Sequence, residues 1–282
     1  IENRYWIGED EDVLSLAVKA TQQLLAKEQL DISEIGALIC STGTPPSMTP
    51  SLACRVLNEL SPDKGEVLMQ AHDVNAACSG YLYALQSAFD FISNAPTKKV
   101  IVITAETLSP MVNRDDPKTY PLFGDAATAS LICCEERPGS IGVKLNRPVL
   151  SATGVDPKVL YVPNLGSDEF IEMEGLTVFK LAVRKMIDML DQACTHRGIT
   201  SEELDYIVPH QANERIIEAI RKTIHCPPEK MFNHISKYGN TSSNTIPIAL
   251  HELMPTLPSG HRVGLTAFGG GFTFGAAVIE KQ

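Results

Sequence analysis

Three residues that are far apart in the sequence each place a reactive group among small or turn-forming neighbours. They are Cys78, which is flanked by alanine and serine, His210, which follows a proline, and Asn240, which follows a glycine. A cysteine thiolate can hold an acyl group covalently, and a neutral imidazole and an amide can donate hydrogen bonds to a developing oxyanion. Together the three groups predict an enzyme that carries an acyl group on a thiolate and then makes a carbon–carbon bond.

The sequence around Cys78 changes from a strand pattern to a helix pattern. The short run at residues 66–69 predicts a buried strand, and apolar residues recur with helical spacing beyond Gly80. At a helix start, free NH groups and the positive end of the dipole favour a thiolate, so we expect them to lower the pKa of Cys78 below about 8.5. The alternative is an inert core cysteine among alanines.

The other two residues have similar settings. His210 follows a strand pattern at residues 206–208, Asn240 precedes a helical pattern at 243–250, and a glycine run follows at 269–271. A lone histidine is more often structural, and Gly-Asn is more often a plain turn, so the interpretation depends on the segments occurring together. At the glycine run the backbone can approach a ligand closely, and its spacing does not fit a dinucleotide fingerprint.

These segments, in this order, resemble the type III β-ketoacyl-acyl carrier protein synthases of the thiolase superfamily. The resemblance covers essentially the whole chain and extends through residues 105–109, 123–127 and 268–273. It implies that the cysteine carries the acyl group and that the histidine and asparagine assist decarboxylation. It also implies an oxyanion hole formed by the backbone NH groups of Cys78 and Gly270.

The chemistry of the histidine and asparagine supports condensation independently of the family. A malonyl thioester loses carbon dioxide only if the enolate left behind is stabilised, and two neutral donors can do this at the thioester oxygen; removing one such donor typically costs about 100-fold to 1000-fold in rate. We therefore expect an acyltransferase that acylates Cys78 and then performs a decarboxylative Claisen condensation with a malonyl-acyl carrier protein, in fatty acid or polyketide initiation.

Other outcomes on the same fold stay open. A ketosynthase of specialised metabolism joins a β-ketoacyl unit to a second acyl chain, and a non-condensing acyltransferase makes no carbon–carbon bond. A non-catalytic ketosynthase partner subunit is disfavoured because such subunits usually lose the nucleophile, which Cys78 supplies here. Chalcone-synthase relatives carry a Gly-Phe-Gly-Pro-Gly segment that this chain lacks. The sequence names neither the primer nor whether it arrives on coenzyme A or on a carrier protein.

The resemblance also implies partners. Arg215 and Lys222 match positions that dock the acyl carrier protein, and a basic face on a chain of net charge -10 suits an acidic partner. The alternative is a solvated helix face with Glu214 and Glu218 in helix salt bridges. Family members are homodimers in which the residue matching Thr49 reaches into the acyl pocket of the partner. A threonine there leaves room for a longer or branched acyl group.

Composition narrows the remaining classes. The chain has 282 residues, 44% of them hydrophobic, and no apolar run of about 18 residues, which predicts a protein without a membrane span. Seven cysteines at irregular spacings predict reduced thiols in the cytoplasm, with neither a zinc site nor a signal peptide. The net charge of -10 disfavours nucleic acid as a partner. No cofactor is expected beyond the acyl thioester substrates.

Alternating strand and helix patterns predict an α/β protein with mostly parallel sheets. The resemblance implies a thiolase-like fold, in which two pseudo-equivalent halves, residues 1–140 and 141–282, form a layered α-β-α-β-α sandwich. Family members begin with about forty further residues, so we expect the first strand region to be missing here. Strands are expected at residues 37–40, 67–69, 100–103 and 129–132 and near 206, 263 and 276; helices are expected at 13–25, 84–92 and around 179–190.

Overall fold

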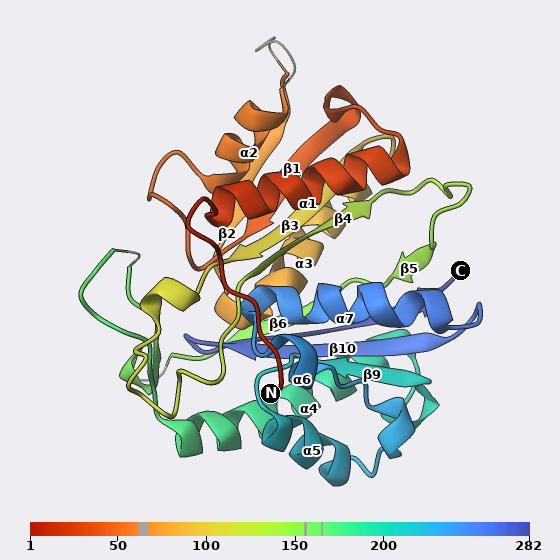
Figure 1. Ribbon diagram of the computed structural model, residues 1–282. Helices are drawn as coiled ribbons and strands as arrows, with labels where there is room; N and C mark the ends of the chain where they lie inside the picture. Colours follow the sequence, from red (N-terminus) through yellow and green to blue (C-terminus); the bar gives the residue numbers. More distant parts are fainter. Residues whose placement is uncertain (62–66, 155–156, 165) are drawn as a thin grey trace.

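The computed structural model describes residues 1–61, 67–154, 157–164 and 166–282. Its elements stack in five layers, from α1 and α2 at the top of Figure 1 to α4 and α5 at the bottom, with α3 and α7 between two sheets. This is the predicted layered α/β sandwich. The helices are α1 (Val13–Glu28), α2 (Leu52–Leu60), α3 (Gly80–Asn94), α4 (Gly175–Arg197), α5 (Glu214–Thr223), α6 (Ile235–Tyr238) and α7 (Thr245–Leu253).

The first sheet has the strand order β2-β1-β3-β4. Strand β1 pairs in parallel with β2 and β3, and β4 pairs antiparallel with β3. Helices cover both faces of this sheet, so its central strands are buried on both sides and are apolar almost throughout. The strands are β1 (Ile35–Ser41), β2 (Gln70–Val74), β3 (Lys99–Glu106) and β4 (Ala126–Ile132).

The second sheet has the order β5-β11-β10-β9, and β6 also pairs with β11. Here only β9 and β10 are parallel, whereas β11 is antiparallel to β10, β5 and β6. The prediction of mostly parallel sheets is wrong for this sheet, because the short glycine turn returns β11 directly beside β10. The strands are β5 (Val143–Leu145), β6 (Val149–Ala152), β9 (Tyr206–Pro209), β10 (Arg262–Gly269) and β11 (Thr273–Lys281), and a separate pair is formed by β7 (Leu160–Tyr161) and β8 (Glu172–Met173).

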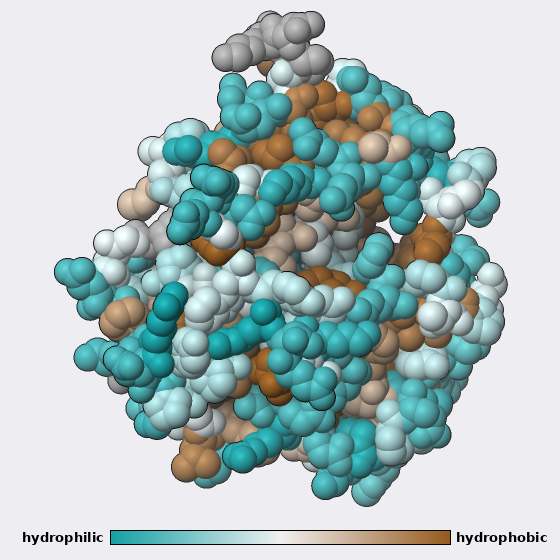
Figure 2. Space-filling view, in the orientation of Figure 1, coloured by the Kyte–Doolittle hydropathy of each residue, from teal (hydrophilic) through white to brown (hydrophobic). Residues whose placement is uncertain are grey.

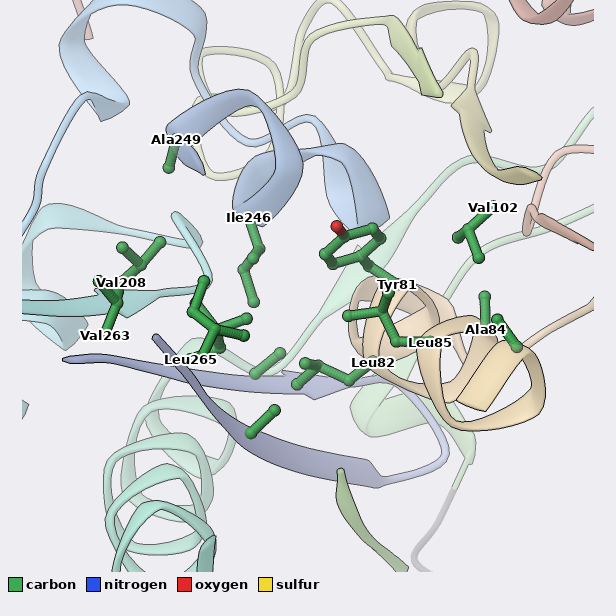
Figure 3. Packing of buried hydrophobic residues seen from close by; sticks show 14 of the residues in the cluster. Tyr81, Leu82, Ala84, Leu85, Val102, Val208, Ile246, Ala249, Val263 and Leu265 are labelled. Atoms are coloured by element: carbon green, nitrogen blue, oxygen red, sulfur yellow. The ribbon is translucent and has the colours of Figure 1, made fainter. Parts of the chain in front are cut away.

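The layer between the two sheets holds the central core. Figure 3 shows Leu82 of α3 and Ile246 of α7 directed toward the second sheet, on the side where Leu265 of β10 lies. All three side chains are fully or almost fully buried, and burying such a side chain contributes about 1.5–3 kcal/mol. Because α3 begins two residues after Cys78 and α7 begins five residues after Asn240, this packing determines where the two functional turns lie.

The strand before Cys78 begins later than predicted. Of the run at residues 66–69, the first residue lies outside the described part of the chain, and Leu68 is 81% exposed. The real strand, β2, is a polar edge strand. The carboxylate of Asp73 in β2 accepts hydrogen bonds from the backbone NH groups of Leu52 and Ala53 at the start of α2, at 2.7 and 2.9 Å. A search for apolar runs misses such a strand.

The other predicted strands and helices are confirmed, whereas α2, α6 and the short strands β5 to β8 were not predicted. The chain passes from the first sheet to the second between the end of β4 and the start of β5, near residue 140. The division into pseudo-equivalent halves at that residue stays a prediction.

The face shown in Figure 2 is mostly hydrophilic, with apolar side chains gathered around the α1 and α2 layer. Within the described residues, no helix has both the length and the apolar character that crossing a bilayer requires.

Candidate active site

Cys78, His210 and Asn240 line one cavity of about 730 Å³. Each residue lies in the turn that follows or precedes a buried element: Cys78 before α3, His210 after β9, and Asn240 between α6 and α7. The structure therefore brings the three predicted residues together. Much of the remaining wall is apolar, with side chains that include Phe123, Leu160, Leu176, Phe179 and Ile216.

The turn that carries Cys78 is anchored to β11. The hydroxyls of Ser79 and Thr273 lie 2.7 Å apart, and each lies 2.8 Å from the carbonyl oxygen of Ala76. Ala77 adopts a left-handed backbone conformation with φ of 46°, which is uncommon for a residue with a side chain. These contacts, which the two hydroxyl protons share, hold the chain in this sharp turn and keep the Cys78 side chain at the cavity, where it is partly accessible.

Gly269, at the end of β10, lets the glycine turn approach the cysteine. A Cβ at Gly269 would lie 2.8 Å from the backbone nitrogen of Cys78 and 2.8 Å from the carbonyl oxygen of Ala76. Only glycine fits such a close approach without displacement of one backbone segment. Gly270, the next residue, lines the cavity beside Cys78.

The pKa of the Cys78 thiol is shifted in the direction opposite to the prediction. Burial raises the pKa to about 11, against the effect of a hydrogen bond from Ser242, and the nearby Glu106 carboxylate raises it further. A helix dipole contributes about 1 kcal/mol, which is less than one pKa unit and smaller than the rise from 9.0 to about 11. Burial therefore outweighs the helix start, and the resting side chain is a protonated thiol.

His210 is fully buried and neutral. Its Nδ1 lies 2.6 Å from the hydroxyl of Thr245 at the start of α7. Burial lowers the pKa of His210 to about 3. Its Nε2 has no hydrogen-bond partner among the described residues. A neutral imidazole with one free ring nitrogen in a cavity wall is able to bind a polar atom of a ligand.

Asn240 is held by its backbone and by one side of its amide. Its NH donates to the carbonyl of Leu122 at 2.8 Å, and its carbonyl accepts from the NH of Gly124 at 3.0 Å. Its Oδ1 accepts from the NH of Ser242 at 2.9 Å. With Oδ1 occupied, the amide NH₂ is left as the free group, with no hydrogen bond to any described residue. Gly239 precedes it with φ of 69°.

The remaining predicted site residues divide into two groups. Gly270 and Arg215 line the cavity, and Arg215 lies in the first turn of α5. Lys222 lies at the other end of α5, outside the cavity, with its Nζ 3.3 Å from the carboxylate of Glu218. Thr49 is exposed in the loop before α2 and is not part of the cavity wall. Its predicted contact across a dimer stays a prediction.

Two cavity residues, Glu106 and Ser242, were identified from sequence only as members of longer motifs. Glu106 ends the buried strand β3 and is 1% exposed, and Ser242 follows Asn240 by two residues. A carboxylate at the end of an otherwise apolar strand is the sequence signal that could have identified Glu106.

Within the described residues, no group of three or more histidine, cysteine, aspartate or glutamate side chains could hold a metal ion.

The layered fold and a thiol in an apolar cavity define the class, a thiolase-fold acyltransferase. Models of 3-oxoacyl-[acyl-carrier-protein] synthase III and of its C-terminal region match residues 72–147 and 194–281. A β-ketoacyl-[acyl-carrier-protein] synthase III of Oleidesulfovibrio alaskensis is 37% identical over 294 residues, covering 99% of this chain and 88% of the relative. The chain belongs to the β-ketoacyl-acyl carrier protein synthase III family.

Solved structures agree with this assignment. The crystal structure of 3-oxoacyl-[acyl-carrier-protein] synthase III from Aquifex aeolicus has a TM-score of 0.87 and 36% identity, covering 98% of this chain and 87% of that one. The priming β-ketosynthase of the R1128 polyketide pathway has a TM-score of 0.86 and 26% identity, covering 98% and 84%. The predicted family, fold class and class of enzyme, a condensing acyltransferase, are confirmed.

Proposed function

We propose that this chain transfers an acyl group from a thioester to Cys78 and then condenses it with a malonyl unit on an acyl carrier protein. The observation that carries the proposal is one apolar cavity that holds a thiol and two neutral donor groups, those of His210 and Asn240. The family membership supports the same chemistry. The proposed role of each residue follows from its chemistry: the thiol is a nucleophile, and the imidazole and the amide are hydrogen-bond donors.

In the first half-reaction the sulfur of Cys78 attacks the thioester carbonyl, and the thiol of the primer's carrier leaves. The tetrahedral intermediate carries a negative oxygen that needs donors about 2.7–3.1 Å away. The backbone NH groups of Cys78 and Gly270 are the proposed donors. The close approach of Gly269 to the Cys78 nitrogen supports this pairing, because it brings the two backbone segments together.

In the second half-reaction the malonyl thioester loses its carboxylate as carbon dioxide. The resulting enolate oxygen accepts hydrogen bonds from the amide NH₂ of Asn240 and from Nε2–H of His210, the two unoccupied groups. This role requires the tautomer in which Nδ1 of His210 accepts the hydroxyl proton of Thr245. The enolate carbon then attacks the acyl-Cys78 carbonyl, and the sulfur of Cys78 leaves. A histidine whose pKa is lowered to about 3 suits this step, because the ring gains no proton near pH 7 and its charge stays constant.

The carrier protein is proposed to dock at the cavity opening near Arg215. This side chain lines the cavity and has no ion-pair partner among the described residues. Lys222 contributes a second positive charge on the same helix, although Glu218 already pairs with it. A cytoplasmic homodimer with Thr49 at the partner's acyl pocket, and catalysis without a further cofactor, complete the proposal.

Acylation and carbon dioxide release test the proposal directly. Incubation with a panel of acyl thioesters, followed by intact-protein mass spectrometry, is expected to add one acyl mass to the wild-type protein. Cys78→Ala is expected to fold normally and to gain no mass, because a small substitution beside alanines leaves little cavity. A stable adduct on Cys78→Ala would contradict the role of this thiol.

The choice of second substrate decides between initiation and its alternatives. The similarity to a polyketide priming enzyme favours priming of a polyketide chain as the second candidate. Product analysis with malonyl and β-ketoacyl carriers separates initiation, whether of a fatty acid or of a polyketide, from the other two outcomes. Condensation with malonyl carriers alone supports initiation, condensation of a β-ketoacyl carrier with an acyl chain supports the specialised ketosynthase, and acyl exchange without a new carbon–carbon bond supports an acyltransferase.

A further inference from the structure

Glu106 is a buried carboxyl group that the two half-reactions leave without a role. It is 1% exposed, lines the cavity, and has no lysine, arginine or histidine partner among the described residues. A buried carboxylate without a cation is costly, which marks the position as functional more than stabilising. Four groups donate to it: the NH of Gly43 at 3.0 Å and the hydroxyls of Thr44 at 3.2 Å, Ser242 at 3.3 Å and Ser243 at 2.8 Å.

Ser242 connects this carboxyl group to the nucleophile. Its Oγ lies 3.3 Å from Oε1 of Glu106 and 3.5 Å from Sγ of Cys78. The backbone of Ser242 has φ of 53°, in the left-handed region where glycine is the usual residue. Its NH is bonded to Oδ1 of Asn240 at 2.9 Å, which holds the turn in place. A serine kept in this conformation presents its hydroxyl between a thiol and a carboxylate.

The single proton of the Ser242 hydroxyl can be donated to only one of these neighbours at a time. When it is donated to Glu106, the thiol of Cys78 can donate its own proton to Ser242 Oγ. When the sulfur is a thiolate, the Ser242 hydroxyl donates to the sulfur, and the carboxyl group, which now carries the extra proton, donates to Ser242 Oγ. The two arrangements differ by one proton moved from sulfur to carboxylate.

We propose that Ser242 and Glu106 relay the proton away from Cys78 during acylation; this rests on the proposed acylation of Cys78. As the carbon–sulfur bond to the acyl group forms, the S–H bond breaks and its proton moves to Ser242 Oγ, while the hydroxyl proton of Ser242 moves to Glu106. The leaving thiolate of the primer's carrier receives a proton in turn, and Glu106 returns to the carboxylate. Ser242 contacts the reacting sulfur, whereas Glu106 acts through Ser242.

The protonation equilibria are compatible with this relay. Burial raises the pKa of Glu106 to about 7, so its carboxylate and acid forms are both populated near neutral pH, as a general base requires. The thiol of Cys78, with a pKa of about 11, needs an acceptor as it attacks. The other titratable side chains in the cavity wall are Tyr161, His210 and Arg215, and of these only His210 is a competing base.

Single-turnover acylation with an acyl-pantetheine thioester, followed by mass spectrometry from pH 6 to 9, tests the relay. Ser242→Gly suits the left-handed backbone but lacks the hydroxyl, and Glu106→Gln keeps the size but cannot accept the proton. Each is expected to lower the acylation rate about 100-fold, a typical contribution of a general base, and to remove the inflection near pH 7. Carbon dioxide release from a malonyl thioester should fall by a smaller factor.

Ser243→Ala is the matched control, because Ser243 donates to the same carboxyl group but forms no hydrogen bond with Cys78 in the described part of the chain. It is expected to retain most of the acylation rate and the inflection. Wild-type acylation rates in Ser242→Gly, or an inflection near pH 7 that persists in Glu106→Gln, would overturn the relay. A wild-type protein that is never acylated would instead overturn the proposed function itself.

Discussion

At the scale of residues, the site combines one group that must lose a proton to react with two groups that stay neutral. Cys78 is a protonated thiol that must lose its proton to react, with a pKa of about 11. His210 is a base that burial keeps unprotonated, with a pKa of about 3. The side-chain oxygen of Asn240 accepts a hydrogen bond from the backbone NH of Ser242. The last two groups are therefore able to take part in hydrogen bonds without changing charge, as the proposed decarboxylation requires.

Asn240→Asp is expected to separate the two half-reactions. A carboxylate would repel the developing enolate, so carbon dioxide release from a malonyl thioester should fall by about 100-fold to 1000-fold. Acylation of Cys78 should retain much of its rate, because its proposed oxyanion hole is formed by backbone NH groups. Both steps are measured on the same preparation. Release of carbon dioxide at the wild-type rate would remove Asn240 from the decarboxylation step.

At the scale of elements, short contacts between the ends of strands and the starts of helices hold these groups in place. The end of β10 approaches the turn before α3, and β11 anchors that turn through a hydroxyl. The loop after Leu122 bonds the backbone on both sides of Asn240. Function is therefore sensitive to the spacing between backbone segments as well as to the reactive side chains.

Gly269→Ala is expected to impair acylation and to destabilise the fold. The added Cβ would lie 2.8 Å from the Cys78 nitrogen, so β10 or the cysteine turn must move; such overpacking costs about 1–3 kcal/mol. Acylation rates and denaturant unfolding measure the two effects. Gly154→Ala is the control, because a Cβ there meets no atom of the described residues within 4 Å. Equal behaviour of the two variants would show that the turn adapts without loss.

Arg215→Glu is expected to raise the apparent KM for a carrier-bound substrate several-fold and to weaken its salt dependence. A pantetheine substrate should be processed unchanged, since it lacks the carrier's acidic surface. Lys222→Glu is a useful comparison, because Lys222 lies outside the cavity and is already paired with Glu218. Equal losses with both substrates would assign Arg215 to the fold or the site instead of docking.

At the scale of the whole molecule, burial of the site couples catalysis to stability through protonation. His210 has its pKa lowered from 6.5 to about 3, and Glu106 has its pKa raised from 4.5 to about 7. The folded protein therefore binds fewer protons than the unfolded chain at His210, and more protons at Glu106. The two groups change stability with pH in opposite directions.

The free energy of unfolding is expected to show both effects when compared with His210→Asn and Glu106→Gln. As pH falls from 6.5 toward 3, wild type should lose stability relative to His210→Asn, because the unfolded chain gains a proton that folded His210 rejects. As pH rises from 4.5 to about 7, wild type should lose stability relative to Glu106→Gln. Each difference should approach about 1 kcal/mol per pH unit. Differences that do not vary with pH would contradict these shifts.

The sequence by itself determined the family, the fold class and the three residues that meet in the cavity, because motifs around Cys78, His210 and Asn240 are local and occur in a specific order. It also located the long apolar strands and helices, whose periodicity is set by burial. The polar edge strand β2 lacked that periodicity and was misplaced.

Only the tertiary structure decided which neighbours modify those groups. The direction of β11, the exclusion of Lys222 and Thr49 from the cavity, and the link from Glu106 through Ser242 to Cys78 all depend on contacts between distant segments. The pKa of Cys78 shows the same limit. A helix start is visible in sequence, whereas the burial that outweighs it exists only once both sheets and their helices have packed around the thiol.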